Sequence, residues 1–113
     1  MQVQEKRIGK FLVVKPIDRR IDFKNGVHFK DKMAELIEGG NMFILLDLSE
    51  VEFIDSSGLG AVVSSLKRMK GRGDLYICGL RETIMTMFNL TRMDRVFRIF
   101  ASEHEAINTL SNP

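Results

Sequence analysis

The chain of 113 residues has few of the side chains on which redox, metal and aromatic chemistry depends: one cysteine, two histidines, one tyrosine and no tryptophan. The single cysteine, Cys78, excludes an internal disulfide and is compatible with a reducing compartment. Because Cys78 lies inside the apolar run 75–78, we expect it to be a small buried hydrophobic residue. No cysteine and histidine residues are spaced as metal ligands, so we expect neither a metal nor a cofactor.

The chain also has little excess of charge of either sign. The 17 basic and 15 acidic residues leave a net charge of +2, and no run of like charge is long enough to form a nucleic-acid-binding arm. No apolar run approaches the ~20 residues needed to cross a bilayer, and residues 1–7 lack the apolar region of a secretory signal. We therefore expect a soluble, cytoplasmic protein that binds neither nucleic acid nor membrane.

The length of the chain predicts one domain spanning residues 1–113, and its hydrophobic residues, 44% of the total, are enough to form a core. Their spacing predicts strands at residues 3–7, 11–17, 42–48, 75–78 and 96–100, and helices at 25–37, 59–70, 82–90 and after Ser102. Pro16 has no amide donor, so we expect it near an edge or an end of its strand. Strands that alternate with helices predict an α/β domain, a mixed central β-sheet with helices packed on it.

Two of these helices carry further expectations. The helix at residues 25–37 should bury one apolar face, made of Val27, Phe29, Met33, Leu36 and Ile37. Gly39-Gly40 should end this helix. In the last helix, Ser102 and Glu105 match a capping box, in which Ser102 is the N-cap and Glu105 reaches back.

The most informative motif is the six-residue stretch Asp55-Ser56-Ser57-Gly58-Leu59-Gly60. It follows a mostly apolar segment, residues 42–54, and leads into the helix predicted at 59–70. We therefore expect a strand to deliver both serines to the first turn of a helix. Backbone amides in a first turn have no acceptor inside the helix, and the helix dipole favours negative charge there. An anionic group on one of these hydroxyls would be stabilised.

The surrounding sequence argues against catalysis by either serine. A serine nucleophile needs a general base and oxyanion donors, whereas His28 and His104 fall on predicted helices without an acid–base group beside them. Residues 54–58 do not match the G-x-S-x-G of hydrolases. The segment 58–60 lacks the spacing, the lysine and the Ser/Thr of a P-loop. We expect no enzymatic activity.

Two interpretations of the motif remain open. In the first, Asp55, Ser56 or Ser57 caps the helix, which stabilises it by about 1 kcal/mol. In the second, Ser56 accepts a phosphate, which adds about −1.5 to −2 charge and three acceptor oxygens. The helix start tolerates this charge, but a partner with carboxylates or apolar groups on the same surface would be repelled.

Residues 43–49 and 53–60 (FILLDLS and FIDSSGLG) resemble the signature of the STAS-domain anti-sigma-factor antagonists. The resemblance continues through residues 90–100 into the Ser102–Leu110 helix and reaches back to Ile21-Asp22, so it covers nearly the whole chain. It implies a single STAS domain. It also implies that Ser56, which directly follows the aspartate, is the phosphorylated serine.

The same resemblance implies the partners. One is an anti-sigma factor that is also a serine kinase of the histidine-kinase ATPase fold; the unphosphorylated antagonist binds it and thereby frees a sigma factor. The other is a metal-dependent serine phosphatase that resets the switch. The residues implied to bind the kinase are Asp22, Asp55, Ser57, Gly58, Leu59 and Gly60.

Asp22 also has a physical role of its own, because an acid at a strand end can cap the following helix or accept a partner's hydrogen bonds. Arg19-Arg20 departs from the family pattern, which usually has glycine and a variable residue here, so this rim differs in shape and charge. We expect a monomer. The main alternative is a STAS scaffold that is never phosphorylated, an accessory subunit of a sensory or lipid-transport complex.

Overall fold

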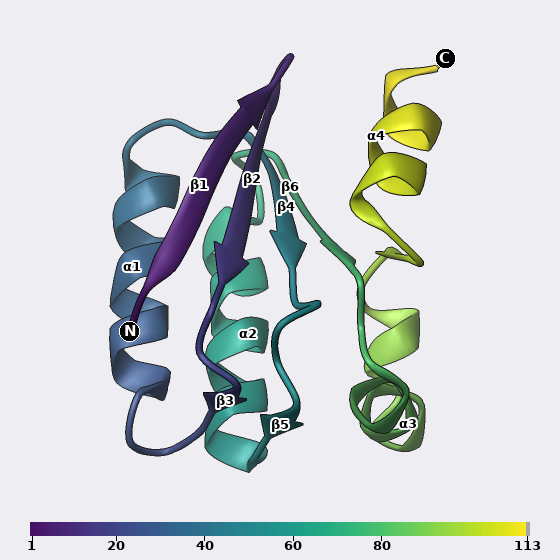
Figure 1. The fold of residues 1–113 in the computed structure, drawn as a ribbon. Coiled ribbons are helices and arrows are strands. Elements are labelled where there is room, and N and C mark those ends of the chain that lie inside the picture. Colours follow the sequence, from purple (N-terminus) through teal and green to yellow (C-terminus); the bar gives the residue numbers. More distant parts are fainter. Residues whose placement is uncertain (113) are drawn as a thin grey trace.

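Apolar segments of the sequence form a five-stranded sheet in the structure, a computed structural model that describes residues 1–112 (Figure 1). The strands, in their order across the sheet, are β1 (Val3–Ile8), β2 (Phe11–Pro16), β4 (Phe43–Asp47), β6 (Asp74–Cys78) and β7 (Ile99–Phe100). β1 pairs antiparallel with β2, and all other neighbours are parallel. The expected mixed central sheet is confirmed, and Pro16 is the last residue of its strand, as predicted.

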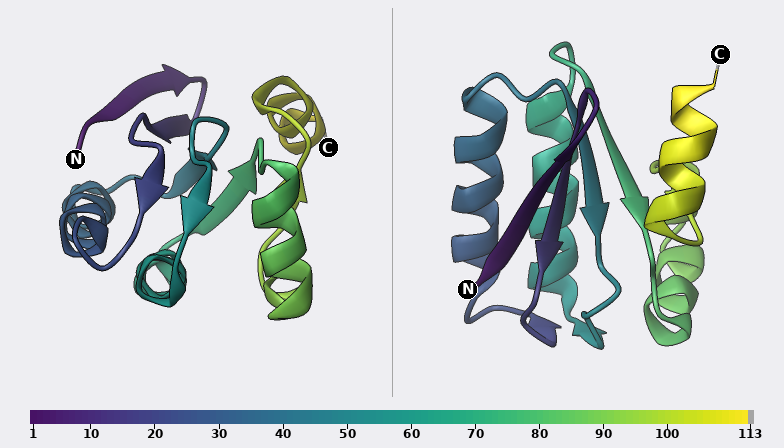
Figure 2. Two further views of the ribbon diagram at one scale, coloured as in Figure 1. Left: turned by 60° about the horizontal axis from the view of Figure 1, so that its bottom comes forward. Right: turned by 45° about the horizontal axis from the view of Figure 1, so that its top comes forward.

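Helices cover both faces of the sheet (Figure 2). α1 (Gly26–Glu38), α2 (Ser56–Met69) and α3 (Glu82–Leu90) lie on one face, and α4 (Glu103–Ser111) lies on the other. The first three provide the crossovers that successive parallel strands require. A short 3₁₀ helix, η1 (Met93–Arg95), follows α3. Within residues 1–112, every helix is too short or too polar to cross a membrane.

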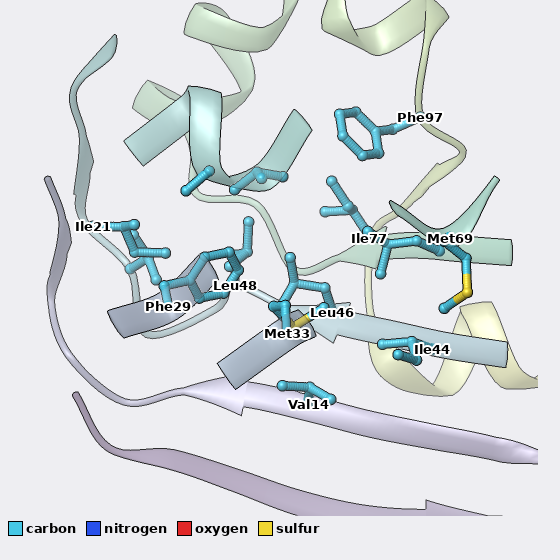
Figure 3. Packing of buried hydrophobic residues seen from close by; sticks show 14 of the residues in the cluster. Val14, Ile21, Phe29, Met33, Ile44, Leu46, Leu48, Met69, Ile77 and Phe97 are labelled. Carbon is cyan, nitrogen blue, oxygen red and sulfur yellow. The ribbon is translucent and has the colours of Figure 1, made fainter. Parts of the chain in front are cut away.

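The larger of two hydrophobic cores lies between the sheet and α1–α3 (Figure 3). Phe29 and Met33 of α1 are fully buried there, together with the strand residues Val14, Ile44 and Leu46. The smaller core lies on the opposite face and contains Val13, Leu45, Cys78, Phe100 and Ala106. Both faces of β4 are therefore buried, which explains its nearly continuous apolar sequence.

A separate pair of short strands leads to the start of α2. β3 (Arg20–Ile21) and β5 (Phe53–Ile54) pair in parallel at the end of the molecule where α1 and α2 begin (Figure 1). The apolar segment before the serines thus forms two strands, β4 and β5, in different sheets. The expectation that a strand delivers both serines to a helix is confirmed, with β5 as that strand.

Two expectations from the sequence are wrong. The strand predicted at residues 96–100 is confined to β7, because Val96 ends η1 and is 50% exposed. Val27 does not belong to the buried face of α1; its side chain is 63% exposed. Each residue turns a helix by about 100°, so Val27 lies about 200° from Phe29 and away from the core.

The helix ends agree more closely with the sequence. Gly39 is the C-cap of α1, and Gly40 follows with φ of 95°, in the left-handed region that favours glycine. Ser102 Oγ accepts a hydrogen bond from Glu105 N at 3.1 Å, as expected. Glu105 Oε2 accepts from Ala101 N at 3.0 Å, one residue before the amide that a standard capping box uses.

Candidate functional site

α2 begins with an aspartate that caps the helix and ties it to a neighbouring turn. Asp55 is the N-cap, and its Oδ1 accepts a hydrogen bond from Gly58 N at 2.8 Å. Its Oδ2 accepts from Phe23 N at 3.1 Å. One carboxylate therefore holds together two segments that are distant in the chain. Of the three residues left open as caps, Asp55 is the one that caps.

Ser56 and Ser57 occupy the first two positions of α2, and both are exposed. Within residues 1–112, neither hydroxyl makes a hydrogen bond, so capping requires neither of them. Their backbone amides also have no acceptor among these residues, as is usual in a first turn. The structure places both serines as the sequence predicts, with side chains open to a partner or a modifying enzyme.

The two glycines of the motif have different surroundings. A Cβ on Gly58 would collide with the backbone carbonyl of Ile21 and lie 3.0 Å from Ile54 Cγ2. A Cβ on Gly60 would have no heavy atom within 4 Å. Gly58 is buried, Leu59 is half-buried and Gly60 is exposed. The close approach at Gly58 is thus made by the domain's own backbone, whereas the space beside Gly60 is open.

Asp22, the residue after β3, is bound within its own chain. Its Oδ1 accepts from the amides of Lys24 (3.0 Å) and Asn25 (3.3 Å), and its Oδ2 accepts from Arg20 Nε (3.3 Å). Burial acts to raise the pKa of Asp22, but these donors together hold the pKa below its ordinary value. The carboxylate stabilises the turn that precedes α1, whose N-cap is Asn25. Its role toward a partner remains a prediction.

The Arg19-Arg20 pair belongs to the same edge of the molecule. The Arg20 guanidinium lies 4.2 Å from the centre of the Phe53 ring, and its Nε lies 3.3 Å from Asp22 Oδ2. Arg19 Nε lies 3.4 Å from Glu52 Oε2, and Arg19 O accepts a hydrogen bond from Glu52 N at 2.7 Å. Both side chains are more than half exposed. The contacts of Arg19 and Arg20 therefore help to hold β3 against β5, and each guanidinium is paired with a carboxylate of the same rim.

A shallow groove of about 270 Å³ runs between the first turns of α1 and α2. Ser57 and Gly60 line its α2 side, and Phe23 and Val27 line the other. Phe23 is 69% exposed and Val27 is 63% exposed, although both are apolar. The sequence-based prediction missed both residues as parts of the site. The available signal was that Val27 is out of phase with the buried residues of its helix.

Within residues 1–112, Ser56 and Ser57 have no histidine or cysteine as a hydrogen-bond partner. His28 and His104 are exposed, and neither is hydrogen-bonded to Ser56 or Ser57. Burial raises the pKa of Cys78 to about 12, so its thiol stays protonated at neutral pH. No group of three or more acidic, cysteine or histidine residues within residues 1–112 could hold a metal ion. What the site presents is an exposed hydroxyl at the start of α2, beside an open groove.

The chain matches known proteins over most of its length. The STAS domain family model matches residues 2–106. A Thermotoga maritima protein provisionally named an anti-sigma factor antagonist is 30% identical over 92 residues, which cover 80% of this chain and 81% of that protein. A crystal structure from T. maritima, under a similar provisional name, has a TM-score of 0.89 at 26% identity and covers 97% of this chain and 95% of that chain.

A more distant structure has the same fold. The Bacillus cell fate determinant SpoIIAA, in its phosphorylated form, has a TM-score of 0.73 at 20% identity and covers 96% of this chain and 99% of that chain. At this identity the likeness shows the fold alone. The family match and the T. maritima relative confirm the resemblance seen in residues 43–60. The chain belongs to the STAS-domain family of anti-sigma-factor antagonists.

Proposed function

We propose that this chain is a phosphorylation-switched binding module. Without phosphate it sequesters an anti-sigma factor that is also a serine kinase of the histidine-kinase ATPase fold. Phosphorylation of Ser56 releases the kinase, and a metal-dependent serine phosphatase resets the switch. The module acts as a cytoplasmic monomer and catalyses no reaction itself. The observation that carries this proposal is the Ser56 hydroxyl, which is exposed and makes no hydrogen bond within residues 1–112, at a helix start that Asp55 already caps.

The relatives support both parts of the proposal. The T. maritima relative bears the provisional name of an anti-sigma factor antagonist, which supports the binding role. SpoIIAA, which shares this fold, exists in a phosphorylated form, which supports a switch controlled by phosphate.

A phosphate on Ser56 would change the surface seen by a partner more than the domain itself. It adds about −1.5 to −2 charge at the end of α2 where the helix dipole stabilises anions. The amides of Ser56 and Ser57, which have no acceptor within residues 1–112, are available to solvate it. A partner carboxylate packed against the same surface would be repelled, at a cost of about several kcal/mol. Binding can therefore be switched while the fold stays intact.

The residues proposed to bind the kinase act in two ways. Three lie at or near the surface of the first turns of α2 and would touch the partner: Ser57, Leu59 and Gly60. Three others hold that surface in shape, by hydrogen bonds or by close packing: Asp22, Asp55 and Gly58. The open space beside Gly60 leaves room for a partner's backbone or side chain against α2.

A comparison of Ser56→Ala with Ser56→Asp tests the switch. We expect the alanine chain, used as bait in the native host, to retain a kinase that mass spectrometry identifies, because alanine leaves the contact surface uncharged. The aspartate chain should retain at least about tenfold less, since its added carboxylate imitates part of the phosphate charge. Equal retention by both variants, together with no phosphate gained on the wild type, would contradict the proposal.

Ser57 provides the matched control. It is the neighbouring exposed serine on the same helix turn. At saturating concentrations of kinase, which offset the contact that Ser57→Ala removes, the purified kinase with ATP should phosphorylate the wild type and Ser57→Ala to the same final extent, and should fail to phosphorylate Ser56→Ala. A STAS scaffold that is never phosphorylated would give no phosphate on any of the three chains.

A further inference from the structure

A second groove begins at Ser56 and runs along the other side of α2, away from α1. It consists of two adjoining hollows of about 430 and 480 Å³, which share Val63 and Lys67. Ser56 and Met93 line the first hollow, and Val96 lines the second. The groove therefore lies between α2 and the segment that contains η1.

The lining of this groove is largely apolar. Leu59, Val63 and Leu66 of α2 are only half-buried, although each carries an aliphatic side chain. On the opposite wall, Met93 is half-buried and Val96 is 50% exposed. Aliphatic side chains that are spaced along one helix and left partly open form the kind of surface into which an amphipathic helix packs. Within residues 1–112, no segment covers them.

Positive charge borders the apolar lining. Lys67 and Lys70 both line the groove, against one acidic residue, Asp74. Among the described residues, neither lysine has a carboxylate within 4.0 Å, whereas Arg68 and Arg72 nearby both pair with Glu38. Two unpaired ammonium groups beside an apolar groove are complementary to a segment that carries carboxylates along the edge of an apolar face.

The length of the groove agrees with such a segment. The 14 residues of α2 rise by about 21 Å, which corresponds to about four turns of a second helix. One end lies at the Ser56 hydroxyl and the other beside the two lysines. A segment bound here would approach the modification site at one end and the positive charges at the other.

We propose that this groove binds an acidic amphipathic helix of the kinase partner, with apolar side chains against Val63 and Leu66 and carboxylates facing Lys67 and Lys70. This assignment rests on the proposed function and extends it to a second surface, on the side of Ser56 opposite the groove between α1 and α2. It adds a contact that depends on charge but lies several helical turns from the phosphate.

The test uses the kinase that Ser56→Ala retains. This kinase is purified, and calorimetric titration measures its affinity for each variant of the chain. Lys67→Glu combined with Lys70→Glu should weaken binding about tenfold or more, because two attractive pairs become repulsive. The matched control combines Lys10→Glu and Arg98→Glu, which changes the net charge equally on the opposite face, where these residues lie over Phe11, Phe43 and Phe100. The control should bind within about twofold of wild type.

Val96→Ser tests the apolar wall without a change of charge. Because this side chain is half exposed, the variant should keep the melting temperature of wild type and bind the kinase about threefold to tenfold more weakly. Kinase binding that is equal for the wild type, the double lysine variant and Val96→Ser would overturn the groove assignment and leave the proposed function standing. If no form of the chain binds a kinase, the proposed function and this assignment both fail.

Two other occupants of the groove would be recognised by further measurements on the same variants. If size-exclusion chromatography shows a wild-type dimer that the double lysine variant abolishes, with kinase affinity unchanged, the groove binds a second copy of this chain. If phosphatidylglycerol vesicles sediment the wild type but not the double variant, again with kinase affinity unchanged, it binds an anionic lipid surface. Either result overturns the assignment to the kinase.

Discussion

Gly58 carries a hydrogen at a point where the domain leaves no room for a methyl group. A Cβ there would meet the carbonyl of Ile21, whereas a Cβ on Gly60 would meet nothing within 4 Å. We therefore expect Gly58→Ala to lower the free energy of unfolding by about 1–3 kcal/mol, since the backbone of β3 must shift. Gly60→Ala should raise it by about 0.5–1 kcal/mol, because glycine is unfavourable inside a helix.

Urea unfolding of the two alanine variants beside wild type measures this difference. Similar midpoints for the two variants would show that α2 does not pack against β3 as described. If Gly60→Ala stabilises the fold and also lowers the affinity for the kinase, glycine at this position serves binding and not folding.

The resemblance seen in the sequence gave these two glycines the same role, that of residues implied to bind the kinase. The structure separates them, because the backbone that approaches Gly58 is Ile21 of the same chain. Contacts between residues so far apart in sequence leave no local pattern. The placement of Asp55 and Ser56 at a helix start was predictable for the opposite reason: residue types and spacing along the chain indicate where one helix begins.

The N-terminal end of α2 and the turn before α1 are joined through one side chain, that of Asp55. Asp55→Ala removes the cap of α2 and the acceptor of Phe23 N together, so we expect a loss of about 1–2 kcal/mol in the free energy of unfolding. Ser56→Ala is the matched control and should change stability by less than about 0.5 kcal/mol, because its hydroxyl makes no hydrogen bond within residues 1–112. Denaturant unfolding of both variants checks this.

Amide hydrogen exchange adds a second measurement on the two hydrogen bonds that Asp55 accepts. Asp55→Ala should speed exchange at both Gly58 and Phe23, since the two amides lose the same acceptor. If only Gly58 changes, Asp55 is a helix cap alone and does not connect the two helices.

Long elements with a clear period were predictable, and very short ones were not. The buried face of α1 and the apolar strand β4 show the spacing that burial on one or both faces requires. β3, β5 and η1 have two or three residues each, too few to show a period. β3 and β5 exist because distant segments pair, as in the hydrogen bond from Glu52 N to Arg19 O, and sequence spacing does not report such pairing.

The fold class and family were predictable because they depend on the order of elements and on the motif at residues 53–60. The two grooves beside Ser56 were not, since each is formed by side chains from segments that meet only in the folded chain. Phe23 and Val96 illustrate why the sequence does not predict the lining of these grooves. Both are apolar residues that an apolar pattern assigns to the interior or to a strand, yet both are at least half exposed.

Among residues 1–112, the fold holds two carboxyl groups, those of Asp22 and Glu38, at a lowered pKa, which makes stability depend on pH in acid. Burial opposes the shift at Asp22, but its hydrogen-bond donors outweigh burial; at Glu38 the hydrogen bond from Arg72 is the main cause of the lowered pKa. Each group therefore binds a proton more weakly when folded than when unfolded. The resulting stabilisation is fully present above the unfolded pKa values of about 4 and is lost as pH falls through the folded values.

We therefore expect the urea midpoint to stay nearly constant between about pH 7 and pH 5 and to fall below about pH 4. Asp22→Asn, which cannot titrate, should lower the midpoint at neutral pH and show a smaller further fall in acid. The control is Asp31→Asn, because Asp31 is exposed on α1 and has no ion pair among residues 1–112. This variant should show the same fall of the urea midpoint with pH as wild type. If Asp22→Asn and wild type lose stability equally in acid, the hydrogen bonds around Asp22 do not hold its carboxylate in the charged form, and the turn before α1 is stabilised by Asn25 and the backbone instead.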